Sequence, residues 1–231
     1  MASSQAINVS TTARLPYNTL RDFTNLTVTA TVPLVLVAGS DFPVSDAASL
    51  IAMTKRQPGE VSYGSSGPGG APHLAAALFA QKAGIELTHI PYRGSTQAHP
   101  DVITGRVGIM FDTVPAVLPH LHSGKLKALA GTGATRSSLL PEVPTLGANL
   151  LPDYEASSWG KLIGPARLPP TVTRRIATDV IAVLQRPEMR ERLRQMGAEV
   201  VANSLEEADR FVAAEITKWG EVVRAAGILP Q

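Results

Sequence analysis

The 231-residue chain contains no cysteine, which excludes disulfide bonds, thiolate catalysis and cysteine-ligated zinc or iron–sulfur centres. Its five histidines show no zinc-binding spacing, since His120 and His122 stand two residues apart and would not share a helix face. We therefore predict no metal site and no cofactor. Charge is scarce too: 21 basic and 19 acidic residues leave a net charge of +2, which argues against a nucleic-acid-binding surface.

Long apolar runs are absent as well. No stretch approaches the roughly 20 apolar residues that a membrane span needs. Residues 1–5 lack the charged and apolar regions of a signal peptide. The sequence therefore predicts a soluble chain without a visible export signal.

What the chain does have is an alternation of strand-like and helix-like segments. Residues 31–38 are a branched apolar run typical of a strand buried on both faces, and residues 154–163 indicate a second long strand. Further strands are predicted at 61–63, 87–91, 107–111, 126–130 and 198–202, and helices at 45–56, 71–82, 98–103, 114–121, 172–184, from 187 and from 204. This alternation predicts an α/β fold with parallel pairing.

The ends of some segments also carry signals. Ser45 is the predicted N-cap of the first of these helices, and Ser204 with Glu207 forms a predicted capping box for the last. Residues 1–27 are polar and are predicted to be irregular.

A Gly/Ser loop at 64–70 stands between a predicted strand and the helix at 71–82. Unpaired N–H groups at a helix N-terminus attract anions, and glycines let a carboxylate or phosphate approach the backbone. The alternative is a tight structural turn. A P-loop is excluded because no Gly-Lys-Ser/Thr follows, and the G-x-G-x-x-G spacing is absent.

Two more loops follow predicted strands, and ligands of open α/β sheets lie beyond the carboxyl ends of strands. His73 either hydrogen-bonds the Gly/Ser loop and holds it or contacts a ligand directly. Tyr92 either covers core or faces a ligand, and Arg93 is expected to face solvent. Asp112 is either an N-cap or a binding carboxylate.

Several short motifs occur in an order and spacing that resemble one family. They are Tyr63-Gly64-Ser65-Ser66-Gly67, His73-Leu74, Pro91-Tyr92-Arg93-Gly94, Met110-Phe111-Asp112, Gly124 to Ala130, Pro141 to Thr145 and Ala214 to Ile228. The chain resembles the Bug-type extracytoplasmic solute receptors of tripartite tricarboxylate transporters over nearly its whole length.

The resemblance implies a periplasmic-binding-protein-like α/β fold with two lobes joined by crossing strands. The first lobe would comprise 1–38 plus 157–231 and the second 39–156. The protein would be no enzyme but a periplasmic receptor that binds a small carboxylate and delivers it to membrane transporter subunits. The resemblance also implies a set of ligand-binding residues: Ser4, Ser65, Ser66, Gly67, Gly69, Gly70, Ala71, His73, Tyr92, Gly94, Ser95 and Asp112.

The family pattern normally begins with an export signal, a strand and a Pro/Gly-rich loop, and none of these precedes Ser3. We expect a receptor whose first lobe lacks its N-terminal portion, with weakened binding and possible self-association through that lobe. One alternative is a non-transporting interaction or regulatory module of the same fold. A remote one is an amidase-like hydrolase, but Lys55 is the sole lysine ahead of the loop.

Overall fold

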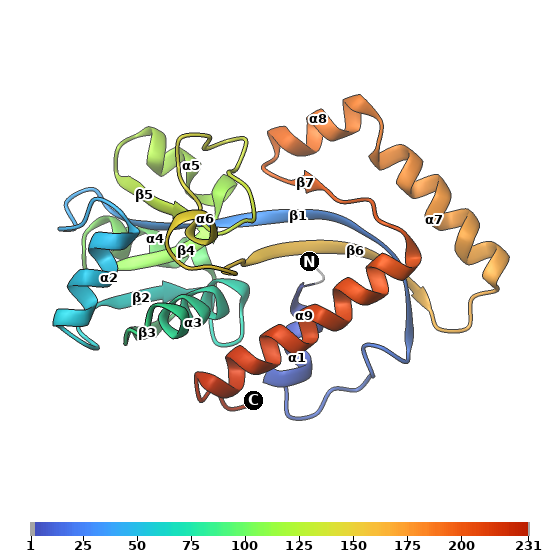
Figure 1. The fold of residues 1–231 in the computed structure, drawn as a ribbon, viewed down its shortest axis with the longest axis horizontal. Coiled ribbons are helices and arrows are strands. Elements are labelled where there is room, and N and C mark those ends of the chain that lie inside the picture. The colour runs from blue at the N-terminus through green and yellow to red at the C-terminus, as the bar shows by residue number, and fades with distance from the viewer. Residues whose placement is uncertain (1–2, 231) are drawn as a thin grey trace. The chain divides into compact units, whose positions relative to one another are not determined.

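The computed structural model describes residues 3–230, which divide into two compact units. Unit 1 contains the described residues up to Val32 and from Ser158 onward, and unit 2 is Pro33–Ser157. The chain passes between the units twice, inside strand β1 (Phe23–Gly39) and at the start of β6 (Ser157–Pro165) (Figure 1). That the units act as the two lobes of a receptor, with boundaries at 38 and 156, stays a prediction.

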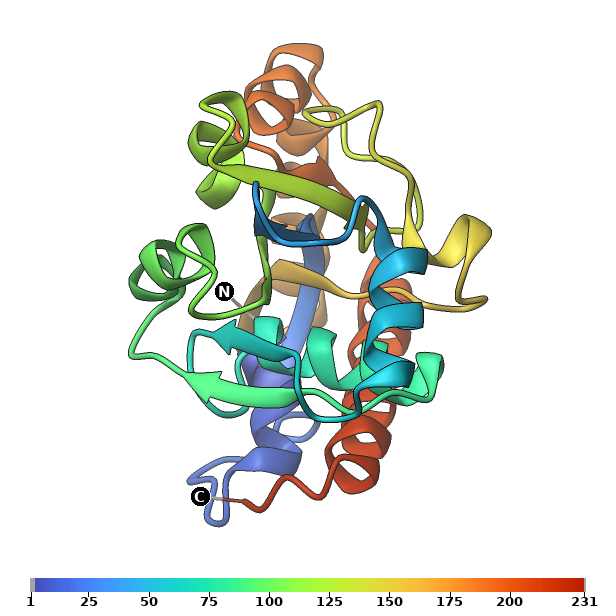
Figure 2. The ribbon, with the colours of Figure 1, turned by 90° about the vertical axis from the view of Figure 1, so that its left-hand side faces the viewer.

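Unit 2 is built on a sheet with the strand order β3-β2-β4-β1-β5, which can be followed in Figure 2 from β3 at the bottom to β5 at the top. Its own strands are β2 (Ser62–Ser65), β3 (Thr88–Pro91), β4 (Ile109–Thr113) and β5 (Leu126–Gly131). Strand β2 runs parallel to β3 and β4, as predicted. The prediction of parallel pairing is wrong for β1, which is antiparallel to both β4 and β5.

Helices cover both faces of this sheet. They are α2 (Ala47–Arg56), α3 (Ala71–Ala83), α4 (Ser95–Ile103), α5 (Val114–His122) and the short α6 (Leu146–Asn149). Val37 of β1 and Met110 of β4 share a core cluster with Ala98 of α4. Side chains alternate between faces along a strand, so the neighbouring Phe111 points the other way, where it meets Phe79 of α3.

The start of α2 departs from the prediction by one residue. Asp46, not Ser45, is the N-cap, and its carboxylate accepts a hydrogen bond from the Ser49 N–H while the Ser49 hydroxyl accepts from the Asp46 N–H. A carboxylate there also matches the positive end of the helix dipole, so it displaces the neighbouring serine from the cap.

Unit 1 pairs α1 (Ser3–Thr11) with α9 (Leu205–Ala225), and the two lie side by side in Figure 1. It also contains α7 (Pro170–Leu184), α8 (Pro187–Gln195) and β7 (Glu199–Val200), which pairs antiparallel with β1. The predicted capping box of Ser204 and Glu207 is confirmed at α9. Among residues 3–230, no helix combines the length and the apolarity that crossing a membrane demands.

The prediction that residues 1–27 are irregular is wrong, because α1 and the first part of β1 lie there. This part of β1 buries the polar side chains of Asn25 and Thr27. Thr27 donates to the carbonyl of Asn203, and the Asn203 side chain accepts from the Val28 N–H, both at 2.8 Å. These bonds supply partners for polar groups in a buried strand.

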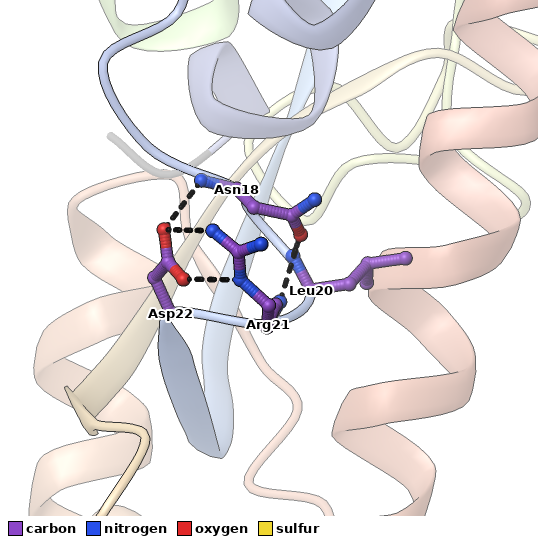
Figure 3. Close-up of polar contacts among 4 residues, drawn as sticks. All are labelled: Asn18, Leu20, Arg21 and Asp22. Atoms are coloured by element: carbon purple, nitrogen blue, oxygen red, sulfur yellow. Dashed lines mark hydrogen bonds and ion pairs between the residues drawn. The ribbon is translucent and has the colours of Figure 1, made fainter.

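The turn that leads into β1 is closed by its own side chains (Figure 3). The Asn18 amide oxygen accepts hydrogen bonds from the N–H groups of Leu20 and Arg21. Asp22 accepts from the Asn18 N–H at 2.7 Å and from the Arg21 guanidinium at 2.8 Å. The Arg21 hydrogen bond is the largest cause of a lowered pKa of the Asp22 carboxyl. The turn thereby sets where β1 begins.

A buried carboxylate organises the core of unit 1. Glu215 of α9 is 7% exposed and accepts hydrogen bonds from the indole N–H groups of Trp159 (2.7 Å) and Trp219 (2.9 Å). It also pairs with Lys218. Trp159 in turn packs edge-on against Phe211. One side chain thus satisfies both tryptophans of the chain and ties β6 to α9.

We predict that Glu215→Leu lowers the unfolding free energy by roughly 2–5 kcal/mol, because it leaves two buried indole N–H groups without an acceptor. Glu215→Gln keeps an acceptor and should lose less. The exposed Glu221 on the same helix is the matched control, and Glu221→Leu should change stability by about 0.5 kcal/mol or less. Urea unfolding followed by tryptophan fluorescence measures all three. Equal stabilities of the Glu215→Leu and Glu221→Leu proteins would contradict this role.

Candidate functional site

Three strand-to-helix junctions meet at one edge of the unit 2 sheet. Strands β2, β3 and β4 are mutually parallel, so their carboxyl ends lie at the same edge. Each is followed directly by a helix, α3 after β2, α4 after β3 and α5 after β4. Three helix N-termini, with their unpaired N–H groups and partial positive charge, therefore gather at this edge.

None of these three helices has a side-chain cap or an acidic residue in its first turn. Of the other helices, α2, α6 and α9 are capped by Asp46, Thr145 and Ser204, whereas α7 and α8 of unit 1 also lack a capping side chain. Capping side chains supply acceptors to first-turn N–H groups. Pro72 of α3 and Pro115 of α5 have no N–H, but the lack of caps leaves the remaining first-turn N–H groups of α3, α4 and α5 for another acceptor, and an external anion is of the right chemistry.

The loop between β2 and α3 holds itself by inward-pointing amides. The Gly67 N–H donates to the Ser65 hydroxyl at 3.1 Å, and the Gly69 N–H donates to Nδ1 of His73 at 3.0 Å. Gly67 and Gly69 adopt φ values of +115° and +71°, which favour glycine. A Cβ on Gly67 would also lie 3.3 Å from the Tyr92 carbonyl oxygen, so the loop packs closely on its neighbour. The predicted hydrogen bond between His73 and the loop is confirmed, and direct contact of His73 with a ligand stays a prediction.

Three aromatic rings stack behind this loop. His73 of α3 lies 4.0 Å from His89 of β3 and nearly parallel to it, and Tyr63 of β2 stacks on His89 at 4.8 Å. Nε2 of His89 lies 2.6 Å from the Ser65 hydroxyl. The stack therefore connects Ser65 and His73, which accept the hydrogen bonds from the Gly67 and Gly69 N–H groups.

Burial keeps this stack uncharged. Burial, together with the charge that His89 would carry, lowers the pKa of His73 to about 4. Burial also lowers the pKa of His89 and raises that of Tyr63. At neutral pH both imidazoles are neutral, so Nδ1 of His73 keeps the lone pair that accepts the Gly69 N–H.

The loop between β3 and α4 carries the predicted residues Tyr92, Gly94 and Ser95. Tyr92 packs against the core, and its hydroxyl donates to Asp101 at 2.6 Å. Burial and this hydrogen bond raise the pKa of Tyr92 to about 12. Gly94 is the N-cap of α4, and Ser95 is the first residue of that helix. The neighbouring Arg93 is exposed, as predicted.

At the third junction, Asp112 is buried and bound on both oxygens. One oxygen lies 2.8 Å from Nε2 of His99, and the other accepts the Thr113 N–H at 2.8 Å. The N-cap of α5 is Thr113, so the reading of Asp112 as the cap is wrong. Asp112 instead links the start of α5 to α4 through these two contacts.

The structure brings the predicted residues of unit 2 together at this edge, since they fall on the strand ends, loops and helix starts of its three junctions. Ser4 lies on α1 in unit 1, and its part in binding stays a prediction. Sequence reasoning missed His89 and His99, whose partners Ser65 and Asp112 are set by strand order and helix packing. A histidine inside a predicted strand or helix was the one available signal.

Catalytic chemistry is not what this arrangement offers. A serine bound to a histidine is also found in hydrolases, but a nucleophile must reach its substrate. Ser65 is 0% exposed, and its hydroxyl already contacts the Gly67 backbone. Within residues 3–230, no group of three or more His, Asp or Glu side chains could hold a metal ion.

Comparison of the sequence with known proteins assigns the chain to a family. Residues 1–228 match the model of the tripartite tricarboxylate transporter family receptor, TctC. A protein from the tcbD–tcbE intergenic region of Pseudomonas sp. strain P51 is 34% identical over 91% of this chain and 63% of its own length. BugT of Bordetella pertussis is 33% identical over 96% of the chain and 68% of its own length. The chain therefore spans about two thirds of the length of these relatives.

Solved structures show the same fold. An R. palustris protein with adipate is 34% identical, with a TM-score of 0.86 over 100% of this chain and 77% of its own. The periplasmic binding protein BugD is 28% identical, with a TM-score of 0.81 over 99% and 77%. The predicted α/β fold of the periplasmic-binding-protein type is confirmed, and these neighbours are binding proteins, not enzymes. The chain belongs to the TctC family of tripartite tricarboxylate transporter receptors, as its motifs predicted.

Proposed function

We propose that the protein is a periplasmic receptor that binds a small carboxylate and delivers it to the membrane subunits of a tripartite tricarboxylate-type transporter. The observation that carries the proposal is the set of three uncapped helix N-termini at one sheet edge. The family match supports the transporter partnership, and the periplasmic neighbour BugD supports the location.

The chemistry of the edge favours a carboxylate over a cation or a neutral solute. Backbone N–H groups at helix starts donate to an anion. The acidic residue of the edge, Asp112, is already paired with His99. A dicarboxylate is the first choice of ligand, because the R. palustris relative at 34% identity was solved with adipate.

We predict that adipate shifts the backbone amide signals of the 231-residue chain at the starts of α3, α4 and α5. NMR titration with adipate to about 10 mM would detect a Kd of about 1 mM. Adipamide has the same length without charge and is the matched ligand control, which should produce no such shifts. Shifts that are absent, or that adipamide reproduces, would contradict a carboxylate site at this edge.

We predict that Gly67→Val weakens adipate binding roughly tenfold to a hundredfold, because a branched side chain strains the loop at its positive φ and presses against the Tyr92 carbonyl oxygen, which distorts the site. Gly59 also has a positive φ but has open space around it, at the far end of β2. Gly59→Val therefore controls for backbone strain alone and should leave the affinity close to that of the unchanged chain. Equal losses in the two variants would place the ligand elsewhere.

Self-association through unit 1 also stays a prediction, and the exposure of Val172 (41%), Val183 (38%) and Met196 (61%) motivates it. Apolar side chains in water favour association. Light scattering over a range of concentrations should show a rising mass, which Val183→Glu with Met196→Glu should suppress. A monomer at every concentration would contradict the prediction.

A further inference from the structure

The loop at 65–70 contains two adjacent serines whose surroundings differ sharply. Ser65 is 0% exposed, and its hydroxyl contacts His89 and accepts the Gly67 N–H. Ser66 is half-buried, and within the described part of the chain its hydroxyl has no hydrogen-bond partner. A Cβ placed on Gly70, the N-cap of α3, would lie 2.6 Å from the Ser66 Oγ. The Ser66 hydroxyl therefore stands beside the start of α3.

We propose that His73 and His89 are positioning residues of the carboxylate site, which hold the loop so that Ser66, and not Ser65, presents its hydroxyl to the ligand. This inference rests on the proposed carboxylate binding and names the residues that set its geometry. The hydrogen bonds from Gly67 and Gly69 to Ser65 and His73 carry it.

The two imidazoles act through different atoms. Nδ1 of His73 accepts the Gly69 N–H directly. His89 acts indirectly, since its Nε2 lies against the Ser65 hydroxyl, and that hydroxyl accepts the Gly67 N–H. The parallel rings, 4.0 Å apart, brace each other. The Gly67 and Gly69 N–H groups therefore already have acceptors, and the Ser65 hydroxyl is buried as one of them. Ser66 is left as the hydroxyl of this loop that is open to a ligand.

The hydrogen bonds from Gly67 to Ser65 and from Gly69 to His73 together form a clamp on the loop, and this clamp requires an unprotonated His73. A proton on Nδ1 would turn that nitrogen from an acceptor into a second donor facing the Gly69 N–H. The titratable rings against His73 are His89 of β3 and Tyr63 of β2. Asp112 of neighbouring β4 turns its carboxylate to His99 of α4 and so does not stabilise a charge on His73. Burial and His89 hold the pKa of His73 at about 4, which matches that requirement.

Two substitutions at His73 separate its acceptor from its ring. Asparagine offers an amide oxygen near the place of Nδ1 but no ring, whereas phenylalanine keeps the stacked ring but has no acceptor. We expect His73→Asn to keep the slow hydrogen exchange of the Gly69 amide and the adipate affinity. We expect His73→Phe to speed that exchange and to weaken adipate binding about tenfold. The reverse order, with His73→Phe unchanged and His73→Asn impaired, would show that ring packing alone matters and would overturn the proposal.

The serine pair supplies the second comparison. Ser66→Ala should weaken adipate binding about tenfold while the Gly67 and Gly69 amides of the free protein keep their slow hydrogen exchange. Ser65→Ala should speed the exchange of the Gly67 amide before any ligand is added. Unchanged adipate affinity in Ser66→Ala, with adipate still bound at this edge, would overturn the assignment of that hydroxyl.

The unchanged chain gives a test that needs neither variant nor ligand. The Gly69 amide signal should be constant from neutral pH to about pH 5 and should move near pH 4, as His73 takes up its proton. A signal that moves near pH 6.5, where an ordinary histidine titrates, would overturn the clamp. Failure of the proposed function would give a different result. The Gly69 amide signal would then still move near pH 4, but adipate would shift no amide signal at this edge.

Discussion

The hydrogen bonds of strand β1 are the constraint on which both units depend. In unit 2 it lies between β4 and β5, and in unit 1 it pairs with β7 and β6. Its second half, Leu34 to Ala38, is at most 1% exposed, so the strand is held by apolar packing as well as by its ladders. Burial of that kind contributes about 1.5–3 kcal/mol for each large apolar side chain.

The position of the candidate site follows from this strand. Because β1 fixes β4 through the pairs from Leu34 with Thr113 to Ala38 with Ile109, it also fixes where α5 begins. The parallel neighbours β2 and β3 then bring the starts of α3 and α4 to the same edge. An uncapped helix start costs about 0.5–2 kcal/mol of stability. A sheet with a buried core on both faces can tolerate that cost at three helices, and the N–H groups it leaves open are what an anion needs.

Much of the fold could be predicted from residues that are close in sequence, and the failures have a common physical reason. The apolar run at 31–38 predicted part of β1, and Ser204 with Glu207 predicted the start of α9, because both signals are local. Residues 23–30 were missed because Thr27 and Val28 depend on Asn203, about 175 residues away. The antiparallel direction of β1 was missed for the same reason, since strand direction is a property of the assembled sheet.

In the candidate site, too, local features could be predicted from the sequence and long-range contacts could not. Composition was enough to mark the Gly/Ser loop and the helix after it as a candidate anion site, a role that stays a prediction, because glycine and helix starts act through the local backbone. It could not tell Ser65 from Ser66, since the two differ in what tertiary packing places beside them, and not in type. His89 reaches Ser65 because β3 pairs with β2, and His99 reaches Asp112 because α4 packs on β4.

The charges at this edge suit a binding site built from dipoles. Asp112 turns its carboxylate to His99, and burial keeps His73 and His89 neutral, so the stack adds no competing charge at neutral pH. Exposed cations such as Arg93 attract an anion from any direction, and salt screens them. Helix N–H groups donate along fixed directions and lose less to salt when they are partly buried. Directional donors on a rigid sheet edge can distinguish carboxylates by shape, which a receptor requires and a diffuse basic patch cannot provide.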